Sequence, residues 1–482
     1  MEDLVDLALA RAREAGASYA DVRIVRRERE TIEVKNGSVD NVSAMDTQGF
    51  GIRVIAEGAW GFASSAKLDK QEILRVAELA VRVARASAAA KKKGRNVTLS
   101  PVKALRAEHS STCKKDPFKI GMEKKVALLL SADRLMRQAP EVKVAQGMLS
   151  FMKEERFFAS SDGARIREDK VISGGVISAT AVRGGEVQKR SYPDGFGDFA
   201  AAGYEFIEDL DLEGHAERIA REAVALLDAP SCPSVTTDLV LGGQQLALQV
   251  HESCGHPVEL DRVLGTEVSL AGASFLTLDK QNKFQYGSPV VNITADATIE
   301  GALGSFGFDD EGVPAQRTEI VKEGRFLNYL TSRETAALLG QTSNGAMRAD
   351  GWNRIPLIRM TNVNLEPGDW SLDEIIKDTK DGIYMESNAS WSIDDYRLNF
   401  QFGTEVAYEI KDGSLGRLLK NPTYTGITPE FWNSCDAVAG KKEWHIWGVS
   451  NCGKGEPMQI MQVGHGTAPA RFRKVKVGVG QW

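Results

Sequence analysis

The segment HESCGH, at positions 251–256, brings two histidines and a glutamate close together in the chain. Neutral imidazole nitrogens are common zinc ligands, and a carboxylate beside them can take a proton from a water molecule that the metal polarises. His251, Glu252 and His256 are therefore the residue types of a hydrolytic zinc site, with two ring nitrogens on the metal and the glutamate as the base. Such a site needs a third protein ligand from elsewhere in the chain.

The two histidines are five residues apart, whereas the familiar zinc-peptidase motif places them four apart. At ~100° per residue, positions five apart lie about 140° apart around a regular helix, so that helix cannot direct both rings at one ion. A wider π-type turn can, and Gly255 and Pro257 both favour an irregular backbone here. We therefore predict a helix over about 244–254 whose last turn loosens and brings His256 beside His251. The alternative is a helix end that carries two ordinary histidines.

Few residues can supply the third ligand, because the chain has only six histidines and five cysteines. Cys452 stands in the segment NCGKGEP, whose glycines indicate an exposed turn where a thiolate could approach a metal. His465 and His445 are rivals, although the second lies among tryptophans and is expected to be a packed or surface residue. Cys254 is a weaker candidate, because it should project to another side of the motif turn.

Length and composition indicate what kind of protein carries these residues. A chain of 482 residues exceeds the ~250–300 that one hydrophobic core usually serves, so two domains are expected. A net charge of -6 argues against a nucleic-acid partner. We expect no membrane-spanning helix, because no apolar run reaches the ~18 residues that one requires. Five scattered cysteines do not suggest a disulfide framework, which favours a cytoplasmic location.

The first half of the sequence reads as a mixture of helices and strands. The pair Asn36-Gly37 between two strand-like runs predicts a β-hairpin. Residues 142–192 read as several strands separated by glycine turns, and residues 95–115 are expected to be irregular. Apolar periodicity predicts helices over residues 3–15, 69–89, 122–138 and 212–227.

The second half begins after the segment APSCPS, residues 229–234, whose two prolines mark the best candidate boundary. The strand VTTDLVLG then leads into the motif helix, and many short strand-like runs with glycine turns follow. We predict an α+β fold with an N-terminal domain, residues 1–228, built on a curved and largely antiparallel sheet. The predicted C-terminal domain, residues 235–482, is mainly antiparallel and barrel-like and carries the metal-site helix.

Several segments resemble the TldD/PmbA family, the modulator-of-gyrase metalloproteases, and in particular its metal-bearing TldD branch. In the second half these segments are HESCGH, FDDEGVPAQRTEIVKEGRFLNYLTS, RMTNVNLEPGDWSLDEIIKDTKDGIYMES, and NCGKGEP with the closing VGVG. The first half contributes the NGSVDNVS hairpin and the strand GFGIRV. The resemblance thus covers nearly the whole chain.

The resemblance implies a role for each matching position. It implies that His251, His256 and Cys452 bind zinc and that Glu252 is catalytic. It also implies hydrolysis of peptides or partly unfolded proteins, bound by backbone pairing to a strand edge. The expected assembly is a homodimer, or a heterodimer with a metal-free PmbA/TldE-like subunit. Residues 382–402 depart from the glycine-rich form expected of the family, so no substrate-lining residue is predicted there.

The resulting hypothesis is zinc-assisted peptide hydrolysis. With three protein ligands, the metal keeps a fourth position for water, and Glu252 accepts the water's proton and passes it to the leaving amine. Carboxylates beyond the ligands should orient the imidazoles, and the nearest in sequence are Glu259, Asp261 and Glu267.

Two other interpretations remain open. In the first, a fourth ligand, His465 or Cys254, closes a structural zinc site in a non-catalytic, chaperone-like binding subunit. In the second, the chain is an amidase with a narrow pocket for a small substrate.

Overall fold

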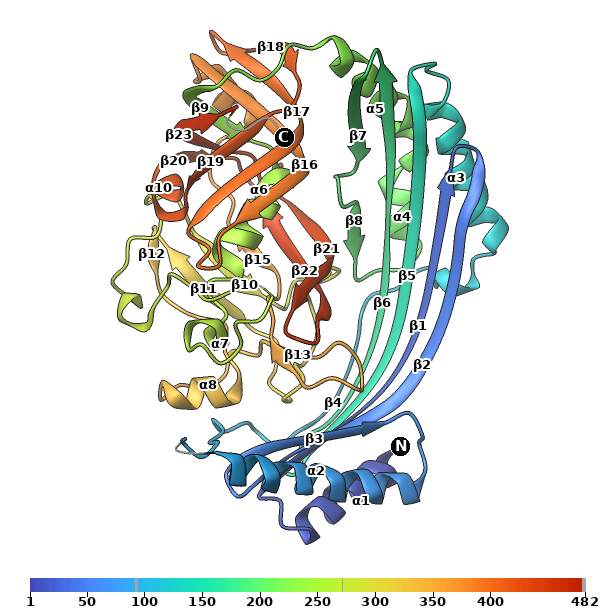
Figure 1. The fold of residues 1–482 in the computed structure, drawn as a ribbon, viewed down its shortest axis with the longest axis vertical. Coiled ribbons are helices and arrows are strands. Elements are labelled where there is room, and N and C mark those ends of the chain that lie inside the picture. Colours follow the sequence, from blue (N-terminus) through green and yellow to red (C-terminus); the bar gives the residue numbers. More distant parts are fainter. Residues whose placement is uncertain (92–93, 271, 479–482) are drawn as a thin grey trace.

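The first half of the chain forms one long curved sheet. In the computed structural model, which describes residues 1–91, 94–270 and 272–478, its strands are ordered β3-β2-β1-β5-β6-β4, with β7 and β8 also paired to β6 (Figure 1). Asn36 and Gly37 join β1 to β2 with φ of 48° and 80°, which confirms the predicted hairpin. The strands are β1 Tyr19–Lys35, β2 Ser38–Ala56, β3 Ala59–Ser65, β4 Arg106–Ser110, β5 Val142–Ser160, β6 Arg165–Arg183, β7 Glu186–Tyr192 and β8 Asp198–Ala200.

Helices cover the sheet near its two ends. One end carries α1 and α2, and the other carries α3 to α5 (Figure 1). The four longest helices lie within two residues of their predicted limits, because each buries an apolar stripe of the expected period. The helices are α1 Glu2–Glu14, α2 Lys70–Ala90, α3 Met122–Met136, α4 Glu205–Leu210 and α5 Leu212–Asp228, with a 3₁₀ turn at Pro117–Lys119.

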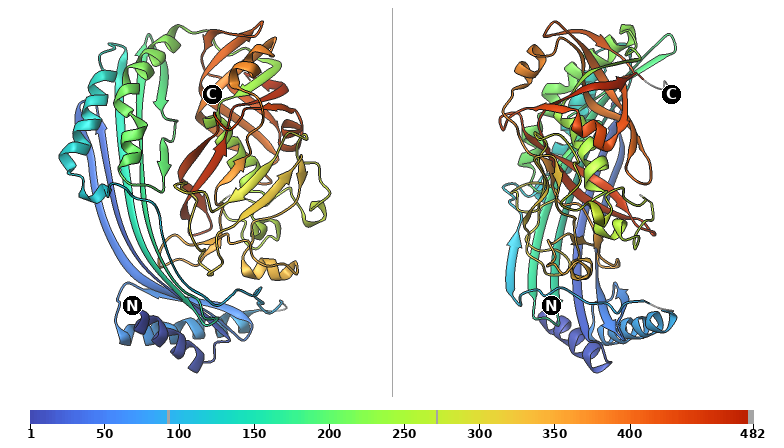
Figure 2. Two further views of the ribbon diagram at one scale, coloured as in Figure 1. Left: turned by 180° about the vertical axis from the view of Figure 1, so that it is seen from behind. Right: turned by 90° about the vertical axis from the view of Figure 1, so that its left-hand side faces the viewer.

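The two faces of the sheet have different partners. Successive side chains of a strand point to opposite faces, and this places Phe151 and Met152 in different clusters. Phe151 packs among residues of α3 and α5, whereas Met152 packs with Leu303 of the second half. The second half of the chain therefore lies on the concave face, opposite to these helices (Figure 2).

A small barrel forms the centre of the second half. Its strands are ordered β16-β9-β23-β19-β17, and pairing between β17 and β16 closes the ring. The β16–β9 pairing is parallel and the other four pairings are antiparallel. The predicted α+β class, with largely antiparallel sheets and a barrel-like second half, is thereby confirmed. The ring strands are β9 Val235–Leu241, β16 Asp381–Ile393, β17 Asn399–Lys411, β19 Thr423–Ile427 and β23 Ala470–Val477.

Shorter elements surround the barrel, and two of them hold the candidate site. These two are α6 Gly243–Val250, which leads into a π-helical turn His251–Gly255, and the two-stranded sheet of β21 His445–Lys454 and β22 Gln459–Thr467. The remaining strands are β10 Ile293–Asp296, β11 Arg317–Lys322, β12 Arg325–Phe326, β13 Met347–Arg348, β14 Leu357–Ile358, β15 Val363–Leu365, β18 Ser414–Leu419 and β20 Cys435–Val438. The remaining helices are α7 Leu260–Val263, α8 Arg333–Leu338, α9 Leu372–Lys377 and α10 Thr428–Asn433, with a 3₁₀ turn at Leu278–Lys280.

The FDDEG segment joins the second half to the concave face of the sheet. Asp310 accepts a hydrogen bond of 2.6 Å from Arg156 on β5, and Glu311 lies 3.2 Å from Arg53 on β2. All four side chains are at least nine-tenths buried. Because each buried charge has an opposite charge beside it, these contacts fix the position of the second half on the sheet.

One expectation for the fold was wrong, and one falls partly outside the described residues. Within the segment 95–115, β4 pairs in parallel with the start of β6, so this segment is not irregular throughout. The side chains of β4 alternate between exposed and half-buried positions, and the strand buries no apolar face. Its sequence therefore lacks the alternation of apolar and polar residues that predicts a strand. Residues 479–482, which include the end of the VGVG motif and the predicted C-terminal limit, are outside the described residues. In the part of the chain that the structure describes, no helix has the length and apolarity needed to cross a membrane.

Candidate metal centre

The two motif histidines lie on one widened turn. The backbone N–H of His256 donates to the carbonyl of His251 at 3.2 Å, a five-residue bond that defines a π turn. The two imidazole rings are therefore neighbours, with centroids 4.8 Å apart. The loosened last turn predicted from the spacing is confirmed.

Gly255 allows this turn to pack against the core. A Cβ atom at this position would lie 2.0 Å from the sulfur of Met360, which is fully buried. A side chain at position 255 would displace the turn that carries both histidines, and glycine avoids this contact.

Cys452 is buried on strand β21 and reaches the histidines from there, so the exposed turn expected from its flanking glycines was wrong. Its Sγ lies 3.8 Å from Nε2 of His256, and one donor atom from each of His251, His256 and Cys452 lies within 4.8 Å of the others. The register of β21 and β22 shifts next to Cys452, which places the thiol beside the motif turn. Cys254 is fully buried and outside this cluster, and half-exposed His445 bonds to Asp198 at 2.8 Å.

His465 orients the ring of His251. Its Nδ1 lies 2.9 Å from the carbonyl oxygen of Val363, which can only accept, so Nδ1 carries the proton. Burial and the neighbouring His251 hold the pKa of His465 well below its usual range, so the ring is neutral and its Nε2 is an acceptor. The Nδ1–H of His251 donates to that atom at 2.7 Å, which leaves Nε2 of His251 with a lone pair for a metal.

Glu259 orients the ring of His256 in a similar way. The Nδ1–H of His256 donates to Oε2 of Glu259 at 3.1 Å, so its Nε2 also carries a lone pair, on the side of Cys452. Arg262 donates to the same carboxylate oxygen at 2.6 Å, and Lys454 lies 3.3 Å from it. These two cations hold the pKa of Glu259 well below its usual range, despite complete burial.

The other two acidic candidates have different contacts. Asp261 accepts two hydrogen bonds from Lys454, at 2.7 and 2.9 Å. Glu267 accepts a hydrogen bond from the backbone of Ser269 at 2.9 Å. Of the three carboxylates predicted to orient the imidazoles, Glu259 is thus the one that contacts a ring.

The electrostatics of the three donors suit a metal cation. Burial alone would raise the pKa of the Cys452 thiol, but Arg359 and His256 outweigh it and lower that pKa to about 7. Burial lowers the pKa of His251 and of His256, which keeps both rings neutral near pH 7. Two neutral imidazoles and an easily formed thiolate are a donor set that fits zinc.

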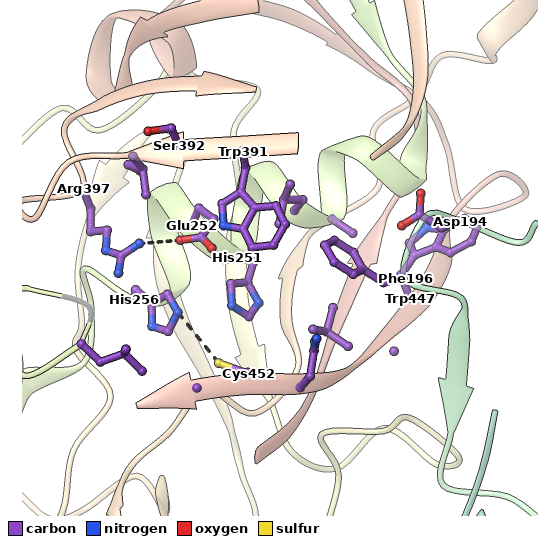
Figure 3. Close-up of a pocket in the computed structure, with 18 of the residues that line it drawn as sticks. Asp194, Phe196, His251, Glu252, His256, Trp391, Ser392, Arg397, Trp447 and Cys452 are labelled. Carbon is purple, nitrogen blue, oxygen red and sulfur yellow. Dashed lines mark hydrogen bonds and ion pairs between the residues drawn. The ribbon is translucent and has the colours of Figure 1, made fainter. Parts of the chain in front are cut away.

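Glu252 and the three donors line one cavity of about 490 Å³ between the barrel, β21 and the loop that follows β7 (Figure 3). Trp391, Trp447 and Phe196 form apolar parts of its wall. Oε2 of Glu252 accepts a hydrogen bond of 2.5 Å from Arg397, which the sequence did not predict. Arg397 lies in the 382–402 segment, and no local spacing relates it to the HESCGH motif.

Known protein families and curated relatives match this chain over most of its length. Three protein-family models match, namely the PmbA/TldA metallopeptidase domain 1 over residues 20–84, the central domain over 115–227 and the C-terminal domain over 234–479. A curated metalloprotease of Methanocaldococcus jannaschii is 31% identical over 436 residues, which are 90% of this chain and 92% of that protein. A zinc metalloprotease TldD homolog of Saccharolobus solfataricus is 23% identical over 475 residues, or 98% of each chain.

Solved structures share the fold. A Thermotoga maritima protein, proposed to be a modulator of a DNA gyrase, has a TM-score of 0.78 at 18% identity, covering 99% of this chain and 100% of that one. TldE of Thermococcus kodakarensis has a TM-score of 0.75 at 18% identity, covering 99% of each chain.

Proposed function

The chain belongs to the TldD/PmbA family of metallopeptidases, and from that premise we propose that it is a zinc-dependent protease that hydrolyses peptides or partly unfolded proteins. His251, His256 and Cys452 would hold the zinc ion, and Glu252 would be the general base. The observation that carries this proposal is the convergence of these four buried side chains on one cavity.

The proposed role of each residue in the site follows from its contacts. A bound zinc ion would supply Lewis-acid polarisation of a water molecule and of the scissile carbonyl. Glu252 would accept the proton of the attacking water at a carboxylate oxygen and later deliver it to the leaving amine. His465 and Glu259 keep the two imidazoles in the tautomer that binds a metal.

The donor geometry supports a catalytic site over a closed structural one. The fourth ligands considered for a structural zinc were His465 and Cys254. His465 Nε2 is occupied by the Nδ1–H of His251, and Cys254 lies outside the cluster. A fourth position would thus remain for water. The cavity wall includes the exposed side chain of Trp391, so the cavity reaches the protein surface and suits a peptide better than a small enclosed amide.

Metal content per chain is the first test. Elemental analysis should find about one zinc per chain in the wild type and in Cys254→Ala, and none in His251→Ala or Cys452→Ala. Zinc that survives Cys452→Ala would place the third ligand elsewhere.

Turnover is the second test. Glu252→Gln keeps the size of the side chain but removes its basicity, so it should reduce peptide hydrolysis about 10²- to 10⁴-fold, to a small residual rate, while the zinc content stays near one. Turnover near the wild-type rate at full zinc loading would refute the role of Glu252.

Assembly, location and domain division are also proposed here. We propose a dimer, either with itself or with a metal-free PmbA/TldE-like subunit, and light scattering of the purified chain with and without such a subunit would distinguish the two. The free state of all five cysteines supports a cytoplasmic location. Limited proteolysis within 229–234 would test the division into residues 1–228 and 235–482.

A further inference from the structure

A basic side chain reaches Glu252 from a distant part of the sequence. Arg397 lies in the turn between β16 and β17, and its Nη1 lies 2.5 Å from Oε2 of Glu252 (Figure 3). Both side chains are buried, at 9% and 8% exposure. Within the described part of the chain, Arg397 is the one lysine or arginine among the residues that line the cavity. The proposed base therefore has a specific cationic partner, which the family motif does not include.

The backbone at Arg397 adopts an uncommon conformation that directs the side chain inward. Its φ is 63°, in the left-handed region that residues other than glycine rarely adopt. The N–H of Arg397 donates to the carbonyl of Asp394 at 2.9 Å, and the carbonyl of Arg397 accepts a hydrogen bond from the hydroxyl of Thr428 at 2.8 Å. The Asp394 carboxylate accepts a further bond from the N–H of Leu398 at 2.8 Å. A strained residue that neighbouring contacts hold in place is characteristic of functional sites.

The contact leaves the two oxygens of Glu252 in different environments. Oε2 accepts from Arg397, whereas no hydrogen bond to Oε1 occurs among the described residues, and the side chain lines the cavity. The terminal torsion of a glutamate is broad, so a free carboxylate would sample many orientations. A general base must instead present one oxygen within hydrogen-bond reach of the proton that it takes.

We propose that Arg397 is a positioning residue for Glu252. Its guanidinium fixes Oε2 and thereby presents Oε1 to the cavity as the oxygen that accepts the proton. Arg397 acts through Glu252 and not on the substrate. This inference deepens the proposed function and rests on it.

The test compares Arg397→Gln and Arg397→Lys with Arg417→Gln. Arg417 is a matched control, because it is 63% exposed on β18 and pairs with Glu409 at 3.1 Å, away from the cavity. Zinc content, kcat and KM are measured for each variant with one peptide substrate. We expect Arg397→Gln to lower kcat about 10- to 100-fold, which is part of the ~10²–10⁴-fold that a general base contributes, because Glu252 itself remains. The KM and the zinc content of Arg397→Gln should stay within about threefold of wild type. Arg397→Lys, or guanidinium added to Arg397→Gln, should restore part of kcat. The control Arg417→Gln should match wild type.

A double variant decides between positioning and direct action. Because Arg397 acts through Glu252, Arg397→Gln should cause no further loss in the Glu252→Gln background. An equal loss in both backgrounds would mean that Arg397 acts on the substrate, and unchanged kcat in Arg397→Gln would mean that it has no role. Either result overturns the proposal.

A readout without turnover separates this proposal from the proposed function. If the wild-type protein hydrolyses no peptide, the proposed function fails, and the contact is then judged from melting temperatures of the metal-free protein. The effects of Arg397→Gln and Glu252→Gln on the melting temperature should be strongly non-additive, because each variant removes the same ion pair. Additive effects would show that the two side chains do not interact, and would overturn the inference.

Discussion

Replacing His465 by leucine should weaken metal binding without touching a ligand. His465 is fully buried and accepts the Nδ1–H of His251. Leucine is similar in size but has no acceptor, so it would leave this N–H buried and unpaired. An unsatisfied buried donor costs about 1–3 kcal/mol. The ring of His251 could avoid this cost by rotating toward another acceptor, and it would then no longer present Nε2 for a metal.

The size of the effect follows from that cost. At about 1.4 kcal/mol per tenfold change in an equilibrium constant, the loss corresponds to roughly 10- to 100-fold weaker metal binding. The same range is typical when the hydrogen-bond partner of a metal-bound histidine is removed.

The assay is zinc affinity by competition with a chromogenic chelator, together with thermal unfolding of the metal-free protein. His465→Gln is the matched variant, because its side-chain oxygen can still accept from His251. We expect His465→Gln to bind zinc within a few-fold of wild type and His465→Leu to bind 10- to 100-fold more weakly. Equal losses in both variants, or none in His465→Leu, would refute the assignment of the His251 tautomer.

Three further predictions concern other buried charges. In the metal-free protein, alkylation of Cys452 by iodoacetamide should rise with pH around a midpoint of about 7, because the thiolate is the nucleophile, and added zinc should suppress it. Lys454→Met should lower the free energy of unfolding by about 3–5 kcal/mol, measured by urea denaturation, because Asp261 and Glu259 lose a buried cationic partner. Burial raises the pKa of Asp194 to about 6, so the native state binds this proton more tightly than the unfolded chain does. Wild-type stability should therefore fall relative to Asp194→Asn, by on the order of 2 kcal/mol, as the pH rises from about 4 to above 6; parallel pH profiles would contradict this.

The parts of the site that are local in sequence could be predicted. The five-residue spacing of His251 and His256 excludes a regular helix on geometric grounds, and Gly255 pointed to the wider turn that the structure contains. Helices with a clear apolar stripe and the Asn36-Gly37 hairpin were likewise found at their predicted places.

The parts that depend on packing between distant segments could not be predicted in the same way. Cys452 was favoured over His465 by the glycines around it and by family resemblance, and no spacing rule relates either residue to the motif. That His465 lies behind His251 depends on where β22 runs past α6, which is a property of the assembled fold. Arg397 gave no signal, because its role depends on a strained turn that places it beside Glu252. The strand β4 was missed because its pairing partner, β6, follows it by more than fifty residues.

The proposed metal donors are far apart along the chain, and this separation determines when the donor set is complete during synthesis. Cys452 follows His256 by 196 residues. At a synthesis rate of about 5–20 residues per second, a ribosome adds the cysteine roughly 10–40 s after the motif. A nascent or truncated chain thus carries HESCGH without the thiolate that completes the donor set. On the proposed ligand set, the chain therefore cannot hold the metal with all three donors until the segment that contains Cys452 has been made.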